Sequence, residues 1–232
     1  MGVKMIIDNQ KRITVVTGHF GSGKTEFAIN YAIDLADKSD NQVAVVDLDL
    51  INMYFRIREQ EKLLKGKGIE VHSTIFNVSS LDIPALDPAI EGVMRDRTKR
   101  VIIDVGGNPS GARALGRYKP TLDEMGYDQV FVINANRPES DTPEKVIAFI
   151  EATQAQSQTF VTGLINTTHL LKATTTETIL EGQKLVDEVS RITGIPVIAT
   201  VARRSLVEEL TDKRPDLNIF PLDLYFRDQW ML

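Results

Sequence analysis

The sequence feature that most constrains the fold is a glycine-rich octapeptide near the amino terminus. Residues 18–25 read GHFGSGKT and match the pattern GxxxxGK[ST] at every fixed position. They follow the β-branched run Ile13–Thr17 and open a helical stretch that reaches about Asp37, so a strand, a tight loop and a helix are expected in that order. Glycine lets backbone N–H groups curve around a phosphate at the positive end of a helix. The octapeptide therefore predicts a phosphate-binding loop.

The residue types of this loop predict separate roles in a nucleotide site. The Lys24 ammonium would reach the β- and γ-phosphate oxygens, and the Thr25 hydroxyl would bind Mg²⁺. A chance match to the pattern is on the order of one in a hundred for a chain of this length. The residues expected to bind the nucleotide are Gly18, His19, Phe20, Gly21, Ser22, Gly23, Lys24, Thr25 and Glu26.

Short apolar runs alternate with helical patterns along most of the chain. Most of the runs are continuously apolar, as expected of strands that are covered on both faces. The alternation predicts an α/β fold of the three-layer P-loop NTPase type, with a doubly wound, mainly parallel sheet and helices on both faces. The predicted strands are Ile13–Thr17, Val43–Asp47, Ile69–His72, Val101–Asp104, Gln129–Asn134, Phe160–Asn166 and Pro196–Val201.

Helix boundaries are marked by capping residues. Thr142 and Pro143 predict a capped start, Gly194 and Pro196 stop a helix over Glu177–Thr193, and Gly66 and Gly68 end a helix that begins near Tyr54.

We find no repeat and no linker, so residues 1–232 are predicted to form one domain. Residues 1–10 and 220–232 would be terminal extensions that pack on it. The aromatic segment Phe220–Leu232 includes Trp230 and is interpreted as a packed cap, with a subunit or partner contact as the alternative. Ser79–Pro88 is the loosest stretch, although its leucines and isoleucine suggest packing.

Aspartates follow two of the predicted strands. Asp47-Leu48-Asp49 ends one strand, and Asp104 ends another, which continues as Val105-Gly106-Gly107. The carboxyl ends of parallel strands meet at one edge of a sheet, so these acids should converge on the phosphate loop. A magnesium nucleotide needs oxygen ligands for the metal and a group that orients water. The predicted metal ligands are Thr25, Asp49 and Asp104, the predicted catalytic residues are Lys24, Asp49 and Asp104, and Asp47 could instead only support the loop.

The phosphate loop, the DxD of 47–49 and the hhhhDxxG that ends at Gly107 together resemble the SIMIBI class of P-loop NTPases. The closest pattern is that of the CobQ/CobB/MinD/ParA nucleotide-binding family, over roughly 13–204, and VVDLDLINMYFR is the most characteristic piece. The resemblance implies that Asp49 positions the hydrolytic water, that Asp104 supports Mg²⁺ and that Gly107 lies at the γ-phosphate. It also implies that Asn166 touches the base, with capping of a strand end as the alternative.

One position departs from this family. MinD and ParA relatives carry a signature lysine directly after the first glycine of the loop, and it reaches across a dimer to the partner's nucleotide. His19 stands there in this chain and cannot supply the same fixed cation. His19 would either donate to a phosphate or a partner, or be a loop residue that packs or faces solvent. Candidates for an arginine finger, each with a solvated or ion-paired alternative, are Arg56, Arg58, Arg113, Arg117 and Arg137.

The stretch expected to meet the base favours adenine. GTP-using relatives end a late strand with NKxD or TKxD, whereas residues 166–169 read NTTH. The sequence therefore predicts a Mg²⁺-dependent protein that binds ATP and ADP, an ATPase acting as a nucleotide-driven switch or as an assembly or maturation factor. The alternative is an ATP-dependent small-molecule kinase or ligase of the dethiobiotin synthetase or cobyrinate amidase type.

Composition narrows the range of partners. Twenty-seven Lys and Arg against 32 Asp and Glu give a net charge of −5, which argues against sequence-wide capture of nucleic acid or of anionic membranes. The absence of cysteine excludes disulfides and thiolate metal sites. No apolar run approaches the roughly 20 residues of a membrane helix. We expect a cytoplasmic protein whose partners are a nucleotide and either a second copy of the chain or a client protein.

Overall fold

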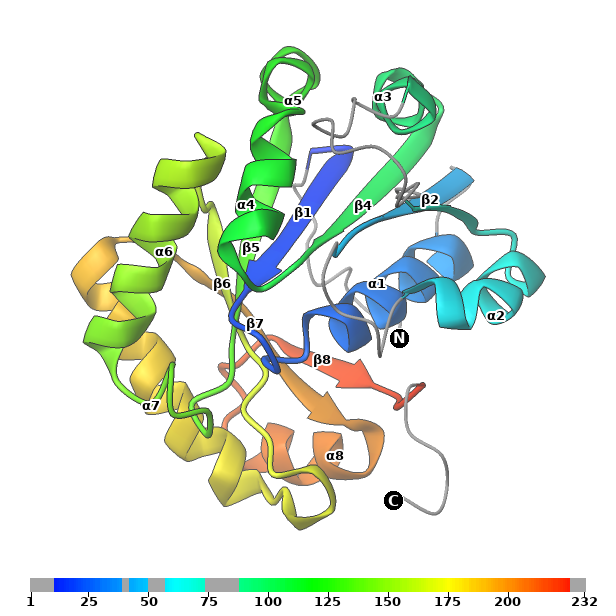
Figure 1. The fold of residues 1–232 in the computed structure, drawn as a ribbon. Coiled ribbons are helices and arrows are strands. Elements are labelled where there is room, and N and C mark those ends of the chain that lie inside the picture. The colour runs from blue at the N-terminus through cyan, green and yellow to red at the C-terminus, as the bar shows by residue number, and fades with distance from the viewer. Residues whose placement is uncertain (1–10, 39–41, 50–56, 74–87, 226–232) are drawn as a thin grey trace.

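A computed structural model describes residues 11–38, 42–49, 57–73 and 88–225, and the structural statements below concern these residues. Eight strands form one sheet in the order β3-β2-β4-β1-β5-β6-β7-β8, and each neighbouring pair is parallel (Figure 1). The strands are β1 (Ile13–Gly18), β2 (Gln42–Leu48), β3 (Glu70–Ser73), β4 (Lys99–Val105), β5 (Tyr127–Ile133), β6 (Gly163–Asn166), β7 (Val197–Arg203) and β8 (Ile219–Leu222).

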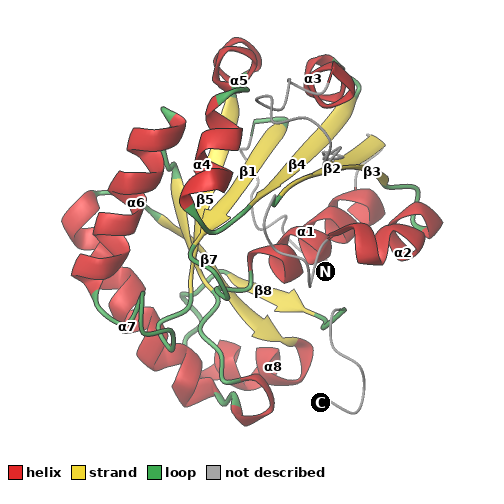
Figure 2. Cartoon of the chain, viewed as in Figure 1, coloured by secondary structure: helices red, strands yellow, loops and turns green. Residues whose placement is uncertain are grey.

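Helices cover both faces of this sheet (Figure 2). The helices are α1 (Lys24–Lys38), α2 (Glu61–Gly66), α3 (Pro88–Arg95), α4 (Pro109–Gly116), α5 (Lys119–Met125), α6 (Pro143–Ser157), α7 (Thr176–Thr193) and α8 (Arg204–Lys213), with short 3₁₀ turns at η1 (Ile57–Gln60) and η2 (Leu171–Ala173). Helices α1 and α2 pack on one face, and α3 to α7 pack on the other. Helix α8 lies beside α7 against β7.

The continuous apolar runs are explained by these two layers. In β1, Val16 packs with Phe27 of α1, whereas its neighbour Val15 packs with Leu115 of α4 on the opposite face. Successive side chains of a strand point to opposite faces, so a strand between two helix layers has no polar side. The predicted α/β fold with helices on both faces of a parallel sheet is confirmed.

The predicted helix boundaries follow capping chemistry closely. Thr142 accepts a hydrogen bond from the Lys145 backbone N–H directly before Pro143, and α6 begins there. Helix α7 ends at Gly194, which has a φ of 73° in the left-handed region. These boundaries are predictable because each depends on a few adjacent residues.

Two strand predictions differ from the structure. The strand predicted from Phe160 begins only at Gly163, and Phe160 itself is 65% exposed. An eighth strand, β8, occupies the start of the segment that was interpreted as a packed cap. Its residues form a run of only four that contains Pro221, which is tolerated because β8 is an edge strand.

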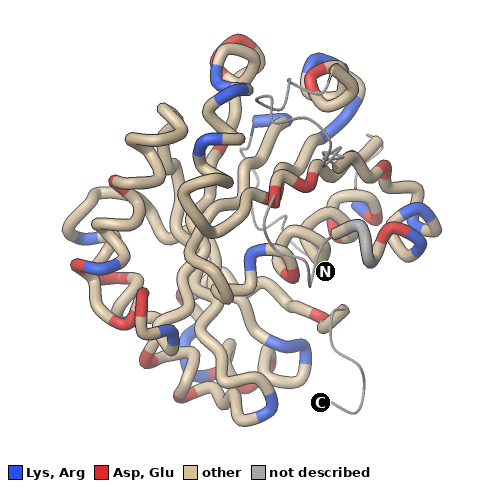
Figure 3. The backbone as a smooth tube through the Cα atoms, in the orientation of Figure 1, with Lys and Arg blue, Asp and Glu red and all other residues tan. Residues whose placement is uncertain are grey.

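Several predictions fall outside the described residues: the helix start near Tyr54, most of Ser79–Pro88, residues 1–10, and the end of the chain with Trp230. Across the described part, charged residues of both signs are interspersed along the outer helices (Figure 3). None of the described helices has the length and apolarity needed to span a membrane.

Candidate functional site

The phosphate loop joins the end of β1 to the start of α1, at the edge where all the strands have their carboxyl ends. Its three glycines, Gly18, Gly21 and Gly23, have φ values of 147°, 72° and 90°, which residues with a Cβ rarely adopt. A backbone hydrogen bond from Ser22 N–H to the His19 carbonyl closes the loop at 3.2 Å. The predicted order of strand, loop and helix is present, and the loop lies at the positive end of the α1 dipole.

Lys24 lies near the carboxyl groups of Asp49 and Asp104 at the base of this loop. Its side chain is only 7% exposed, and its Nζ donates to the His19 carbonyl at 2.8 Å. Burial lowers the pKa of the Lys24 ammonium below its usual range, and the nearby carboxylates of Asp104 and Asp49 act against this. Asp47 pairs in register with Asp104 across β2 and β4, and its Oδ1 accepts from the Asp49 backbone N–H at 2.9 Å. Asp47 thus supports the loop that carries Asp49.

Asp104 carries the clearest sign of a missing ligand. It is 2% exposed, and among the described residues its Oδ1 accepts no hydrogen bond. Burial, followed by the negative charge of Asp47, raises the pKa of Asp104 to about 7, although Lys24 and the hydroxyl of Thr25 lower it. A buried carboxylate oxygen without a partner is costly, and a bound cation would relieve that cost.

The donors present fit a magnesium ion carried by a nucleotide. Thr25, Asp49 and Asp104 offer hard oxygen atoms, and the described residues contain no group of three or more His, Cys, Asp or Glu that could hold a metal by themselves. Mg²⁺ is commonly held by one or two carboxylates together with waters and substrate phosphates. When bound, it would be held by Thr25, Asp49 and Asp104 and would neutralise negative charge on the phosphates.

The raised pKa of Asp104 predicts a pH dependence of stability. In the nucleotide-free protein, Asp104 keeps its proton up to a pH of about 7, whereas in the unfolded chain it loses the proton near about 3.9. Since the folded state binds more protons between these values, its free energy of unfolding should fall as pH rises through that window. Asp104→Asn should flatten the fall, measured by urea unfolding without nucleotide or divalent cations. The exposed Asp212→Asn is the control, and an unchanged slope in Asp104→Asn would contradict the assignment.

The loop after β4 presses directly on the phosphate loop. A Cβ at Gly107 would lie 2.5 Å from the Phe20 nitrogen and 2.8 Å from the Gly18 oxygen. A Cβ at Gly106 would lie 3.0 Å from Asp49 Oδ1. The predicted DxD and DxxG elements therefore meet beside the phosphate loop, and the glycines make that approach possible.

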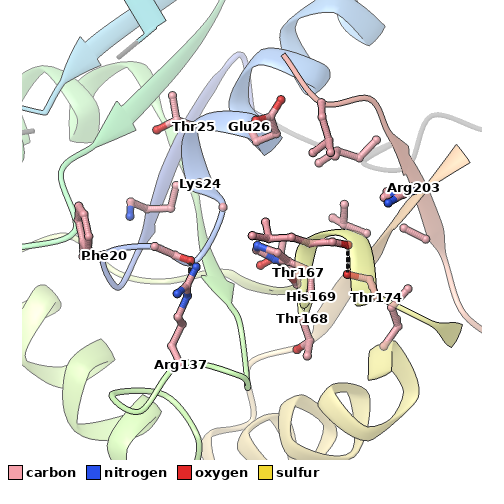
Figure 4. Close-up of a pocket in the computed structure, with 18 of the residues that line it drawn as sticks. Phe20, Lys24, Thr25, Glu26, Arg137, Thr167, Thr168, His169, Thr174 and Arg203 are labelled. Atoms are coloured by element: carbon pink, nitrogen blue, oxygen red, sulfur yellow. Dashed lines mark hydrogen bonds between the residues drawn. The ribbon is translucent and has the colours of Figure 1, made fainter. Parts of the chain in front are cut away.

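A cavity of about 270 Å³ extends from this cluster along the strand ends. Figure 4 shows Lys24 and Thr25 at one end and Thr174 and Arg203 at the other. Gly21, Gly23 and Asp49 also line the phosphate end. The far end is mainly apolar, and its aliphatic side chains are Leu171, Ile179, Val201, Ala202, Leu222 and Leu224. This polarity, charged at one end and apolar at the other, matches a nucleotide with its phosphates on the loop.

Of the cavity residues that were not among the predicted nucleotide-binding residues, three lie against the phosphate loop. Arg137, considered only as one of several arginines, donates from Nε to the Gly21 carbonyl at 3.0 Å. The Thr167 hydroxyl donates to the Ser22 carbonyl at 2.6 Å. His169 lines the cavity beside Gly23 and holds its Nδ1 2.8 Å from the Thr167 carbonyl oxygen. All three follow β5 or β6, so the rule that ligands bind at strand carboxyl ends was the available signal.

The structure does not bring Asn166 into the cavity. Its side chain is fully buried, its Nδ2 donates to the Gln183 Oε1 at 2.9 Å, and its Oδ1 accepts from the Thr168 backbone N–H. The capping alternative describes this geometry, because both ends of the amide are used inside the protein.

His19 and Phe20 lie at the outer side of the loop. The His19 ring makes an edge-on contact with Phe149 of α6, with ring centroids 4.8 Å apart, which is the packing alternative. Phe20 is 61% exposed at the cavity rim. Ser22 is buried, and its Oγ has no hydrogen-bond partner in the described structure. Arg113 and Arg117 do not line the cavity, and Arg56 and the side chain of Arg58 lie outside the described residues.

Solved structures share this fold. FtsY, the cell division protein of Thermotoga maritima, matches 80% of this chain and 59% of its own length, at 18% identity and a TM-score of 0.56. Signal recognition particle receptor FtsY from Elizabethkingia anophelis, in complex with GDP, matches 82% and 56% at 16% identity and a TM-score of 0.54. The 54 kDa signal recognition particle protein from Aeropyrum pernix, also with GDP, matches 85% and 43% at 17% identity and a TM-score of 0.53.

These likenesses establish that the chain has the fold of FtsY and of the 54 kDa signal recognition particle protein. The chain spans about half of the length of these proteins. Neither a protein-family model nor a curated protein matches the sequence. The likeness to the CobQ/CobB/MinD/ParA family therefore stays a prediction from the sequence motifs.

Proposed function

We propose that this protein binds a Mg²⁺–nucleoside triphosphate at the phosphate loop and hydrolyses it as a nucleotide-driven switch. The observation that carries the proposal is the buried Asp104 Oδ1, which lacks a hydrogen-bond partner beside Thr25 and Lys24. A phosphate-bound Mg²⁺ supplies the missing positive charge, and the loop glycines and Lys24 supply donors for the phosphates. Asp49, the third predicted ligand, lines the same end of the cavity.

We infer further that the base is adenine. Guanine presents an N–H and an amino group that proteins commonly recognise with a carboxylate, an acceptor-only group. Two carboxyl side chains among the described residues line the cavity. Asp49 lies at the phosphate end, and the Glu26 carboxylate already accepts a hydrogen bond from the Tyr225 backbone N–H, whereas residues 167–203 contribute no Asp or Glu to the lining. The bound GDP of the two matched proteins shows that this fold also accommodates guanine. The choice of ATP therefore depends on the base end of this cavity and not on the fold.

Hydrolysis would use Asp49. Its carboxylate lies beside Gly106 and the cavity, where it can accept a hydrogen bond from a water molecule. The oxygen of that water would bond to the γ-phosphorus as the bond to the bridging oxygen breaks, giving ADP and phosphate. Loss of the γ-phosphate would then change the position of Asp49 and of the loop after Asp104, and with them the affinity for a partner, either a second copy or a client protein.

The proposal is tested by calorimetric titration with ATP and GTP in Mg²⁺ and by phosphate release. We expect ATP to bind at least about tenfold more tightly than GTP, because an unpaired guanine donor costs about 1–3 kcal/mol. Asp49→Asn keeps an oxygen for the metal but loses the negative charge, so it should lower hydrolysis by about 100-fold or more, a larger loss than the loss in Mg·ATP affinity. The exposed Asp212→Asn is the matched control. Tighter binding of GTP would overturn the choice of base, and full hydrolysis by Asp49→Asn would overturn the role of Asp49.

The second candidate function is an ATP-dependent small-molecule kinase or ligase. It differs from the switch in how fast phosphate is released from ATP alone. Such an enzyme would bind Mg·ATP but release almost no phosphate until an acceptor molecule is added. Phosphate release from ATP alone supports the switch. Tight ATP binding without release, followed by strong stimulation with one carboxylate metabolite, would favour the ligase.

A further inference from the structure

The segment after β8 is hydrogen-bonded to the first turns of α1, the helix that follows the phosphate loop. Phe220 of β8 packs edge-on against Phe27 of α1, with ring centroids 5.5 Å apart. The chain then continues as Leu222, Asp223, Leu224 and Tyr225. Leu222 and Leu224 line the apolar end of the cavity, so alternate residues of an extended segment face the same space.

Asn30 holds this segment in place. Its Oδ1 accepts from the Asp223 backbone N–H at 2.8 Å, and its Nδ2 donates to the Asp223 carbonyl at 2.8 Å. The Asn30 side chain is 6% exposed, and the same Nδ2 donates to the Glu26 carbonyl one turn earlier in α1. Asparagine is a poor helix former, so its place in the middle of α1 is explained by this two-point contact.

Two more hydrogen bonds hold Tyr225, two residues after Asp223. The Tyr225 backbone N–H donates to the Glu26 carboxylate, and the Tyr225 carbonyl accepts from Gln60 Nε2 at 2.9 Å. Glu26 directly follows Thr25 of the phosphate loop, and Gln60 precedes α2. The segment is thus fastened on both sides of Leu224 to elements that border the nucleotide site.

We propose that Leu222–Tyr225, which we call the base wall, forms one side of the binding site for the adenine base, and that Asn30 is its positioning residue. The inference rests on the proposed nucleotide-binding function and deepens it. Leu171 of η2, Ile179 of α7, and Val201 and Ala202 of β7 supply the other sides of the apolar end. A planar aromatic base buries both of its faces there, so the position of Leu222 and Leu224 decides how much contact it gains.

This arrangement separates the base from the phosphates. The base wall has no contact with Lys24 or with the glycines of the loop in the interactions described above. A ligand that carries only phosphates, such as inorganic tripolyphosphate, therefore does not depend on it. Asn30→Asp keeps the shape of the side chain but loses the donor, and it places a carboxylate against the carbonyl oxygens of Glu26 and Asp223.

The test compares Mg·ATP with Mg·tripolyphosphate by calorimetric titration of the full chain. Asn30→Asp and Leu224→Ala should each weaken the binding of Mg·ATP about tenfold and leave the affinity for Mg·tripolyphosphate unchanged. Arg204→Ala is the matched control, because Arg204 contacts the same segment through the exposed Asp223 carboxylate, at 2.8 Å, and should change neither affinity. Thermal melting checks that each variant is folded. If Asn30→Asp does not fold, Leu224→Ala still tests the proposal, because it leaves the hydrogen bonds of Asn30 intact.

Each other outcome has a distinct meaning. If Leu224→Ala and a folded Asn30→Asp variant both bind ATP as tightly as the unmodified protein, the proposal that the base wall contacts the base is wrong. Equal weakening of ATP and tripolyphosphate also overturns it, because the segment would then act through α1 and the phosphate loop. If the unmodified protein binds neither ligand, the proposed nucleotide-binding function itself fails.

Discussion

Replacing Lys24 with methionine is expected to weaken Mg·ATP and Mg·ADP binding by at least about 100-fold, since losing charge-assisted hydrogen bonds to two phosphate oxygens costs about 3 kcal/mol. Without nucleotide, the Lys24 ammonium donates to the His19 carbonyl inside the loop. When a nucleotide binds, the ammonium would donate to anionic phosphate oxygens in place of this neutral carbonyl. Because such charge-assisted hydrogen bonds are stronger, Lys24 should contribute a large part of the binding free energy. Methionine keeps an unbranched apolar stem, so the packing around the side chain changes little.

The measurement for Lys24→Met is calorimetric titration with ATP and ADP in excess Mg²⁺. Lys65→Met is the matched control, because Lys65 is an exposed lysine paired with Glu61 and lies away from the cavity. Removing the ammonium also removes the charge that lowers the pKa of Asp104, so that pKa should rise further in the variant. Wild-type affinity in Lys24→Met would contradict the assignment of this loop to phosphate.

Replacing Gly107 with alanine should cause the second large effect, a combined loss of stability and of nucleotide affinity. The added Cβ would meet backbone atoms of the phosphate loop at 2.5 to 2.8 Å, and backbone cannot move aside as the end of a flexible side chain can. We expect a cost of about 1–3 kcal/mol in the free energy of unfolding, as for other overpacked sites. Because the loop itself must shift, ATP affinity should fall in the same variant.

Gly92 offers a matched control for this substitution. It lies exposed in α3, and a Cβ there would have nothing within 4 Å. Gly92→Ala should therefore raise the free energy of unfolding by about 0.5–1 kcal/mol through backbone entropy alone. Urea unfolding and ATP titration of the two variants measure both effects. If Gly107→Ala unfolds and binds ATP like the unmodified protein, the close approach of the two loops is wrong.

Structural features that depend on neighbouring residues were predictable from the sequence, whereas features that depend on distant residues were not. The octapeptide 18–25, the Thr142 cap and the Gly194 stop are each set by a few neighbouring residues, and they lie where the sequence places them. By contrast, Asn166 was assigned to the base by analogy. Its partners, Ile179 and Gln183, come from α7 and lie 13 and 17 residues further along the chain. Motif matching does not reveal which way such a side chain turns.

The structure of the carboxyl-terminal segment also depends on contacts with residues far away in the sequence. Its aromatic residues predicted packing, but neither the edge strand β8 nor the contact of Asn30 with Asp223, 193 residues away, follows from the local pattern. A polar residue in the middle of a helix beside the phosphate loop was the available sign that something must pair with it.

The sequence by itself determined the phosphate loop, the alternation of strands and helices, and the aspartates at two strand ends, because glycine conformations, capping and periodicity act within a few residues. Only the tertiary structure decided which strand ends are neighbours. The order β2-β4-β1-β5 places Asp47 beside Asp104 and β4 next to the strand that leads into Lys24, so burial and the charge of Asp47 raise the pKa of Asp104 while Lys24 lowers it. Strand order is set by the burial of both faces of the whole sheet, a sum over many residues that no single segment contains.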